Sequence, residues 1–288
     1  MSIRWHEEAP LDLREAIRFT AEETGFAPRL IEKDYFCSVI LEALTEADVP
    51  LVFKGGTCLA KIHSGFFRLS EDLDFSIATA ANATRSVRRR AIAPVKAVVD
   101  RLPNRIPGFE LLVPLEGHNV STQYNATFGY RSLLVSGTET IQIEIGLREP
   151  TLTPPERAQV HSVLLHWAQG GALLETFETR CLTYVEAMAE KLRAALSRQE
   201  VAIRDFFDID HAVRVAGLDV NGAELVRLLR AKLAVPGTGA VNVSAERLND
   251  LRQQLDAHLR PVLRSREFEL FDMDRAFGIV RGVAEGLG

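Results

Sequence analysis

The sequence predicts an α+β (α/β) protein whose mixed sheet, flanked by helices, is followed by a helical carboxy-terminal domain. The first observation is that residues 51–77 read as strand, glycine turn, helix and strand, in that order. The second is that residues 109–147 hold three strand-like segments separated by turn signals. The third is that helical periodicity replaces strand alternation after the prolines that begin at Pro150. We therefore expect one domain over residues 1–150 and a second over residues 151–288.

The composition indicates an ordinary soluble protein of the cytoplasm. Hydrophobic residues make up 47% of the 288 residues and charged residues 25%. No apolar run is long enough to cross a bilayer, and the first residues lack the pattern of a signal peptide, so we expect no membrane partner. The three cysteines, an odd number spread far apart, favour reduced buried thiols over a disulfide framework or a zinc site. The net charge of −5 argues against a protein that coats nucleic acid everywhere, but it allows a local basic face.

Two helices are expected before the first strand, at residues 11–24 and 28–44, because apolar residues recur there at helical spacing. Glu32, Lys33 and Asp34 stand together in the second of them. We interpret these three residues as the polar edge of the helix and assign none of them a catalytic role.

A glycine turn after the first strand suggests a phosphate site. The apolar residues 51–53 suit a buried strand, Gly55 and Gly56 break it, and Thr57 is placed to cap a helix that runs to about Ile62. A backbone that bends there points free N–H groups and the positive end of a helix dipole at one spot. That spot favours a phosphate, although a lone Gly-Gly-Thr is usually only a turn.

The next strand, at residues 72–77, carries two aspartates. Because alternate residues of a strand share a face, Asp72 and Asp74 point together while Leu73 and Phe75 point to the core. Paired carboxylates suit Mg²⁺ or Mn²⁺, which bind carboxylates together with substrate phosphates. A lone Asp-x-Asp is usually a solvated strand edge. The order of turn, helix and acidic strand nevertheless favours metal-assisted phosphoryl or nucleotidyl transfer.

These motifs carry a resemblance to a known family. Gly-Gly-Thr followed by Arg-x-Ser-x-Asp-x-Asp resembles the signature of the polymerase-beta-type nucleotidyltransferase superfamily, in the form found in the AbiEii/AbiGii toxin family and its MenT relatives. The residues that match are Gly55, Gly56, Thr57, Arg68, Ser70, Asp72 and Asp74. Residues 31–35, 189–194 and 204–209 are similar to three further motifs of the family, in the same order. The resemblance therefore extends over residues 31–209.

The resemblance implies a nucleotidyltransferase fold, an activity and a biological setting. Gly56 and Thr57, with Gly55, Arg68 and Ser70 around them, would hold the β- and γ-phosphates of a nucleoside triphosphate (NTP), while Asp72 and Asp74 hold metal across the α-phosphate. An acceptor hydroxyl would then attack the α-phosphorus and release pyrophosphate. The family consists of toxins that are neutralised by a cognate antitoxin protein. Relatives add nucleotides to an RNA acceptor, the 3′ end of tRNA, and block translation. Nucleotidylation of a protein, or an inactive nucleotide- or RNA-binding module, is the alternative.

A third carboxylate is expected from the strand at residues 138–147. Ile141, Ile143 and Ile145 alternate with polar residues, so Glu144 faces away from the core. The superfamily often takes a third metal ligand from such a strand, and Glu144 is the candidate for it. A glutamate that simply faces solvent is the equal alternative.

Two later helices hold the remaining candidates. Lys191 borders an apolar stripe in the helix expected at residues 179–197, where the resemblance implies a charge for the triphosphate and a surface lysine is the alternative. Asp205 and Asp208, three apart in the helix at residues 203–215, share a face. Acids in a first turn commonly just complement the helix dipole. The resemblance implies that one of them acts as a base or orients the hydroxyl, contributing with Lys191 to the cleft, and the sequence does not decide which.

Three other features are weaker. The segment of residues 85–105 is rich in arginine and predicts either a phosphate-binding surface or a solvated helix face. Asp208 and Asp210 lie two apart in a helix, so their side chains should diverge. Asp272, before the helix expected at residues 273–285, is interpreted as a helix cap.

Overall fold

The computed structural model describes residues 4–287, and the chain divides after Leu182 into two compact units, Met1–Leu182 and Thr183–Gly288. The boundary differs from the one expected at residue 150. The prolines there lead into a hairpin at the edge of the sheet, formed by β6 (Glu156–Val160) and β7 (Phe177–Cys181). Because both strands pair within the sheet, they belong to the first unit.

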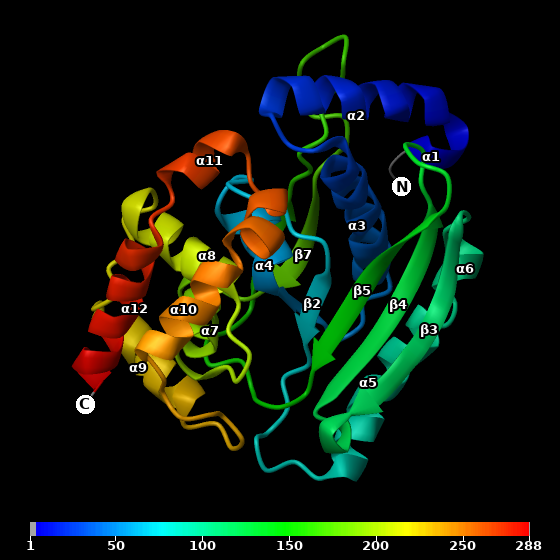
Figure 1. Cartoon of the computed structure of the whole chain (residues 1–288). Helices are drawn as coiled ribbons and strands as arrows, with labels where there is room; N and C mark the ends of the chain where they lie inside the picture. Colours follow the sequence, from blue (N-terminus) through cyan, green and yellow to red (C-terminus); the bar gives the residue numbers. More distant parts are fainter. Residues whose placement is uncertain (1–3, 288) are drawn as a thin grey trace. The chain divides into compact units, whose positions relative to one another are not determined.

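The first unit is built on a mixed sheet, as the sequence predicts, and the sheet has seven strands because β6 and β7 join the five expected ones (Figure 1). The strand order is β3-β4-β5-β2-β1-β7-β6. The β2–β5 and β1–β7 pairs are parallel and the other pairs antiparallel. The remaining strands are β1 (Val52–Lys54), β2 (Leu73–Ser76), β3 (Phe109–His118), β4 (Gln123–Arg131) and β5 (Thr138–Gly146).

Helices of this unit occupy the expected places, with short additions. The two long amino-terminal helices are α2 (Pro10–Thr24) and α3 (Pro28–Glu46), and the arginine-rich segment forms α5 (Arg85–Val99). A proline stands at the start of α2 and of α3, where its missing N–H costs nothing. The short elements are α1 (Trp5–Glu8), α4 (Gly55–Cys58), η1 (Leu59–His63), α6 (Leu102–Arg105) and η2 (Asn119–Ser121).

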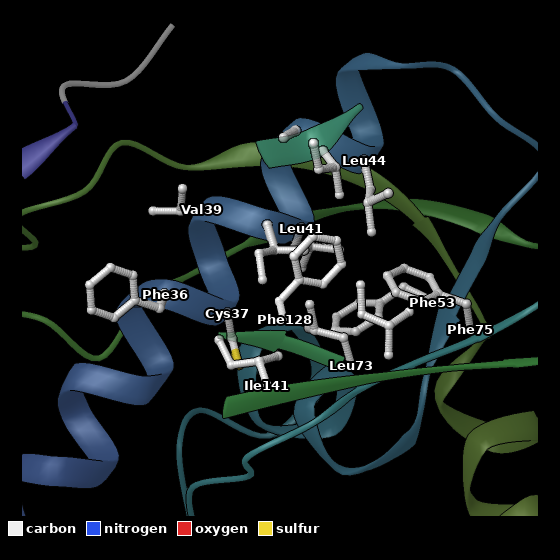
Figure 2. Packing of buried hydrophobic residues seen from close by; sticks show 14 of the residues in the cluster. Phe36, Cys37, Val39, Leu41, Leu44, Phe53, Leu73, Phe75, Phe128 and Ile141 are labelled. Carbon is white, nitrogen blue, oxygen red and sulfur yellow. The ribbon is translucent and has the colours of Figure 1, made fainter. Parts of the chain in front are cut away.

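The hydrophobic core lies between one face of this sheet and helices α3 and α5. Apolar side chains of α3, among them Phe36 and Leu41, belong to one buried cluster with Phe75 and Ile141 of the sheet (Figure 2). Ile92, Val95 and Val99 bring α5 into the same cluster. Alternation along the strands then turns the polar residues of β2 and β5 to the opposite face.

The three charged residues of α3 are buried, so they are not the polar edge expected from the sequence. Glu32 is fully buried and its carboxylate accepts hydrogen bonds from Ser132 Oγ (2.8 Å) and Leu133 N (2.6 Å). Asp34 forms an ion pair with Lys61 Nζ at 2.7 Å, and both side chains are almost inaccessible. A buried charge must be paired, and the Asp34–Lys61 pair joins α3 to η1, the helical segment after the glycine turn. The helix therefore supports the turn.

The second unit is helical, as expected. Its first helix begins at Tyr184 and not at residue 179, because residues 177–181 form β7 and Thr183 caps the helix through Glu186 N. Asp272 Oδ1 accepts a hydrogen bond from Arg275 N (3.0 Å), which fits the predicted cap of α12. The elements are α7 (Tyr184–Ser197), α8 (Ile203–Arg214), α9 (Ala223–Leu233), α10 (Ala245–Gln253), η3 (Leu255–Leu259), η4 (Arg260–Val262), α11 (Ser265–Leu270) and α12 (Met273–Leu287). Across residues 4–287, no helix has both the length and the apolar character needed to span a membrane.

Candidate active site

The glycine turn connects β1 to α4. Gly55 has a positive φ of 76°, and α4 starts there and continues into η1 as far as His63. The first N–H groups of a helix have no partner within it, so this turn presents backbone donors. Thr57 lies inside the helix and does not cap it, which corrects the expectation. Its Oγ1 donates to the carbonyl of Asp72 at 2.5 Å and fixes the turn to the start of the acidic strand.

Asp74 lies directly on the first glycine. It is paired with Lys54 between the antiparallel strands β1 and β2. A Cβ atom on Gly55 would be 2.0 Å from Asp74 Oδ2, so only glycine leaves room for this carboxylate. Lys54, which the sequence analysis did not single out, shares the face of Asp74. Its place one residue after buried Phe53 could have revealed this.

Arg68 and Ser70 lie on the second glycine. A Cβ atom on Gly56 would be 2.6 Å from Arg68 Nη2 and 3.0 Å from Ser70 Oγ. The Arg68 side chain is buried, with Nη1 donating to the Leu69 carbonyl at 3.1 Å. Residues that are separated in the sequence thus converge on the glycine pair, with a guanidinium charge packed against the turn.

Glu144 of β5 joins Asp72 and Asp74 in a row of carboxylates that we call the acidic row. It pairs with Asp74 in the parallel register of β2 and β5, while Ile143 pairs with Leu73 beside it. Since Ile143 and Leu73 are buried in the core, Asp74 and Glu144 share the opposite face. Asp72 directly precedes β2, and alternation assigns it to that face too. Glu144 is exposed there.

The donors on this face fit a divalent metal bound to a triphosphate. Carboxylate oxygens are the ligands that Mg²⁺ and Mn²⁺ take from proteins, and the remaining positions go to water and phosphate. The adjacent turn offers N–H groups, and Lys54 and Arg68 carry positive charges that could offset those of phosphates. Carboxylates suited to a metal and hydrogen-bond donors suited to phosphates therefore both lie in the first unit.

In the second unit, the two downstream motifs form one cluster. Lys191 Nζ of α7 lies 2.7 Å from Asp205 Oδ1 and 2.9 Å from Asp208 Oδ2, both of α8. Arg198 also contacts Asp205, at 3.3 Å. The Asp208 side chain is fully buried and that of Lys191 is 13% exposed, so Lys191 is not an ordinary surface lysine. Asp210 turns away to Arg275, as its helical spacing predicts.

The arginine-rich helix α5 covers the core face of the sheet. Its apolar stripe enters the core, and Arg88 is buried with Nε donating to the Leu147 carbonyl at 3.2 Å. Arg85, Arg89 and Arg90 are exposed. These charges therefore belong to a helix that covers the face opposite Asp74, and closeness in sequence to the acidic strand does not place them beside it.

Comparisons with known proteins point to one family. The family described as "Nucleotidyl transferase AbiEii toxin, Type IV TA system" matches residues 39–277. Among curated proteins there is no match. A crystal structure of a candidate nucleotidyltransferase from H. pylori has 19% identity and a TM-score of 0.47, covering 89% of this chain and 96% of its own. The structure of JHP933 from Helicobacter pylori gives 19% identity and a TM-score of 0.49, with coverages of 89% and 94%.

The family match spans both units, including the glycine turn, the acidic strand and the Lys191 cluster. The chain belongs to the AbiEii family and is a nucleotidyltransferase of the type found as the toxin of type IV toxin–antitoxin systems.

Proposed function

We propose that the protein uses Mg²⁺ or Mn²⁺ to transfer a nucleotidyl group from an NTP to RNA, at the 3′ end of tRNA, and so blocks translation. The observation that supports this most strongly is the packing of Asp74 on Gly55 and of Arg68 and Ser70 on Gly56. This packing brings a carboxylate, which can bind metal, and hydrogen-bond donors, which can bind phosphate, to one turn. The family supplies the setting of a toxin with a separate antitoxin partner.

The chemistry follows from these groups. The acceptor hydroxyl oxygen forms a bond to the α-phosphorus, and the bond from that phosphorus to the bridging oxygen of the β-phosphate breaks. Pyrophosphate leaves, and the hydroxyl proton passes to a base. The turn at Gly55, Gly56 and Thr57 would hold the β- and γ-phosphates, with Arg68 and Ser70 behind it. Asp72, Asp74 and Glu144 would hold the metal, which supplies positive charge to the attacking and leaving oxygens.

The test of this function is direct. The protein is incubated with Mg²⁺, each labelled NTP in turn and total tRNA, and the wild type is compared with Asp72→Ala. We expect label in the 3′-terminal nucleotides of tRNA with the wild type alone. Label in a co-purifying protein would instead identify a protein acceptor. Equal labelling by both proteins, or nucleotide binding without transfer under any divalent metal, would contradict the proposal.

Glu144→Gln tests the third metal ligand. The change removes a charge from an exposed position while keeping the shape, so the fold should be unaffected. If Glu144 holds the metal, the Mg²⁺ concentration for half-maximal activity should rise roughly tenfold. Titration of transfer activity with Mg²⁺ measures this. An unchanged titration would assign Glu144 to the solvent face only.

Lys191→Met tests the cluster of the second unit, with Lys232→Met as its matched control. Lys232 is also a buried lysine of this unit, paired with Glu186 at 2.8 Å and Glu190 at 3.0 Å. Each change leaves carboxylates without their buried cation, so both should lower the unfolding temperature. At a temperature where both variants are folded, Lys191→Met should lose at least about tenfold in transfer rate and Lys232→Met should lose little. Equal rates would limit Lys191 to a structural role.

Asp205 and Asp208 can be distinguished in the same assay. We propose that one of them acts in the reaction as base or as orienting group. Asp208 is fully buried and Asp205 slightly exposed, so Asp205 is the better placed to exchange a proton. Asp205→Asn should therefore reduce the rate more than Asp208→Asn. The reverse order would transfer the role to Asp208.

A further inference from the structure

Two of the three cysteines lie together beside a histidine, outside the site described above. Cys58 ends α4, His63 ends η1 and Cys181 ends β7. The two sulfurs and a ring nitrogen of His63 all lie within 4.8 Å of one another. The sequence favours isolated thiols because Cys58 and Cys181 are far apart along the chain. The parallel pairing of Cys181 with Phe53 closes that distance.

The spacing suits a tetrahedral zinc ion. Zinc binds cysteine sulfur at about 2.3 Å and histidine nitrogen at about 2.0 Å, so neighbouring ligand atoms stand roughly 3.5–3.8 Å apart. Side-chain rotations that move each atom by about an ångström or less would close the group around such an ion. Two thiolates and an imidazole select zinc over Mg²⁺ or Ca²⁺, which prefer oxygen ligands.

The histidine makes the kind of hydrogen bond that metal-binding histidines make. Its Nε2 lies 3.0 Å from the carbonyl oxygen of Leu182, and an N–H donated there leaves Nδ1 with the lone pair. Metal-binding histidines characteristically donate their other ring N–H to a carbonyl or carboxylate in this way. Nδ1 lies 3.9 Å from Glu156 Oε1.

Glu156 stands beside the fourth coordination position. It is paired with Cys181 between the antiparallel strands β6 and β7, so the two side chains share a face. Its side chain is 44% exposed, whereas both cysteines are fully buried. The glutamate is therefore the solvent-exposed member of the group.

We propose that Cys58, His63 and Cys181 form a zinc site, with Glu156 at its fourth position. The ion would tie α4 and η1 to the end of β7. Since Cys58 directly follows Thr57, the bound ion would hold the glycine turn in place. It would take no part in nucleotidyl transfer.

Cobalt substitution tests the site on the full-length protein. After removal of metals with a chelator, Co²⁺ is titrated into wild type, Cys181→Ser and Cys37→Ser. Cys37, the third buried cysteine, lies outside the group and is the matched control. We expect a sulfur-to-cobalt charge-transfer band and strong visible bands that saturate at one equivalent in wild type and Cys37→Ser. Cys181→Ser should lose most of the charge-transfer intensity, and Glu156→Gln should weaken zinc binding roughly tenfold.

A second measurement needs no variant, in case Cys181→Ser does not fold. Zinc should slow alkylation of Cys58 and Cys181 in the wild type, followed peptide by peptide, and leave Cys37 unaffected. Absence of the charge-transfer band in the wild type, its full retention in Cys181→Ser, or thiols unprotected by zinc would each overturn the proposal. So would a Cys58–Cys181 disulfide in mild reductant with no metal uptake. No readout uses nucleotidyl transfer, so the result is independent of the proposed function.

Discussion

Asparagine in place of Asp74 is expected to slow nucleotidyl transfer by about 10³-fold or more. The substitution keeps the size of the side chain that fits against Gly55 but removes the charge that would hold the metal. A metal ion contributes several kcal/mol of charge stabilisation in the transition state, and each 1.36 kcal/mol changes the rate tenfold. Pyrophosphate release, measured at saturating NTP and several Mg²⁺ concentrations, would report the loss.

The control for this variant is Glu110→Gln. Glu110 is an exposed carboxylate on β3 of the same sheet, away from the acidic row in the strand order. Its replacement makes the same chemical change and should leave the rate within about twofold. Unfolding temperatures of both variants should remain near that of wild type. A rate for Asp74→Asn within tenfold of wild type would remove Asp74 from the metal site.

Alanine in place of Gly55 is expected to abolish transfer and to destabilise the first unit. The added Cβ would lie 2.0 Å from Asp74 Oδ2 and 2.7 Å from the Asp74 Cβ. The turn, the strand or both must therefore shift. A displacement of about an ångström at reacting groups can cost on the order of 10²-fold in rate. Gly55 also has a left-handed backbone conformation, which alanine disfavours. Together these two effects should reduce the rate by about 10³-fold.

Gly65→Ala separates these two causes. Gly65 also has a positive φ, 62°, but no heavy atom of the described residues lies within 4 Å of a Cβ built on it. This variant should lose only about 1 kcal/mol of stability for its backbone conformation and retain transfer activity. If both alanine variants lost activity equally, backbone strain and not contact with Asp74 would explain the effect of Gly55→Ala.

The sequence was sufficient for the parts of the fold that depend on local patterns. Alternation in β5 assigned Glu144 to the face away from Ile143, and the register with β2 agrees with it. The spacing of Asp208 and Asp210 predicted their divergence. Both follow from the fixed geometry of one strand or one helix.

Features that depend on pairing between distant segments could not be predicted. Strands β6 and β7, the last two in the order of the sheet, follow prolines and are separated by irregular chain, and the last residues of β7 fit the helical pattern of α7 equally well. Glu32 and Asp34 are charged, like residues on the exposed edge of a helix. Their burial depends on partners from other elements, Ser132 and Lys61. Cys58 and Cys181 meet only through the order of the strands.

Metal-dependent nucleotide binding tests the central claim, that the glycine turn and the acidic strand bind one metal–triphosphate unit. Calorimetry would use an NTP with a non-hydrolysable α–β bridge, with and without Mn²⁺, on wild type and Asp74→Asn. We expect Mn²⁺ to increase the affinity of the wild type about tenfold or more, and to leave that of Asp74→Asn unchanged. A wild-type affinity that is independent of metal, or an equal gain in Asp74→Asn, would show that turn and strand do not bind the same ligand.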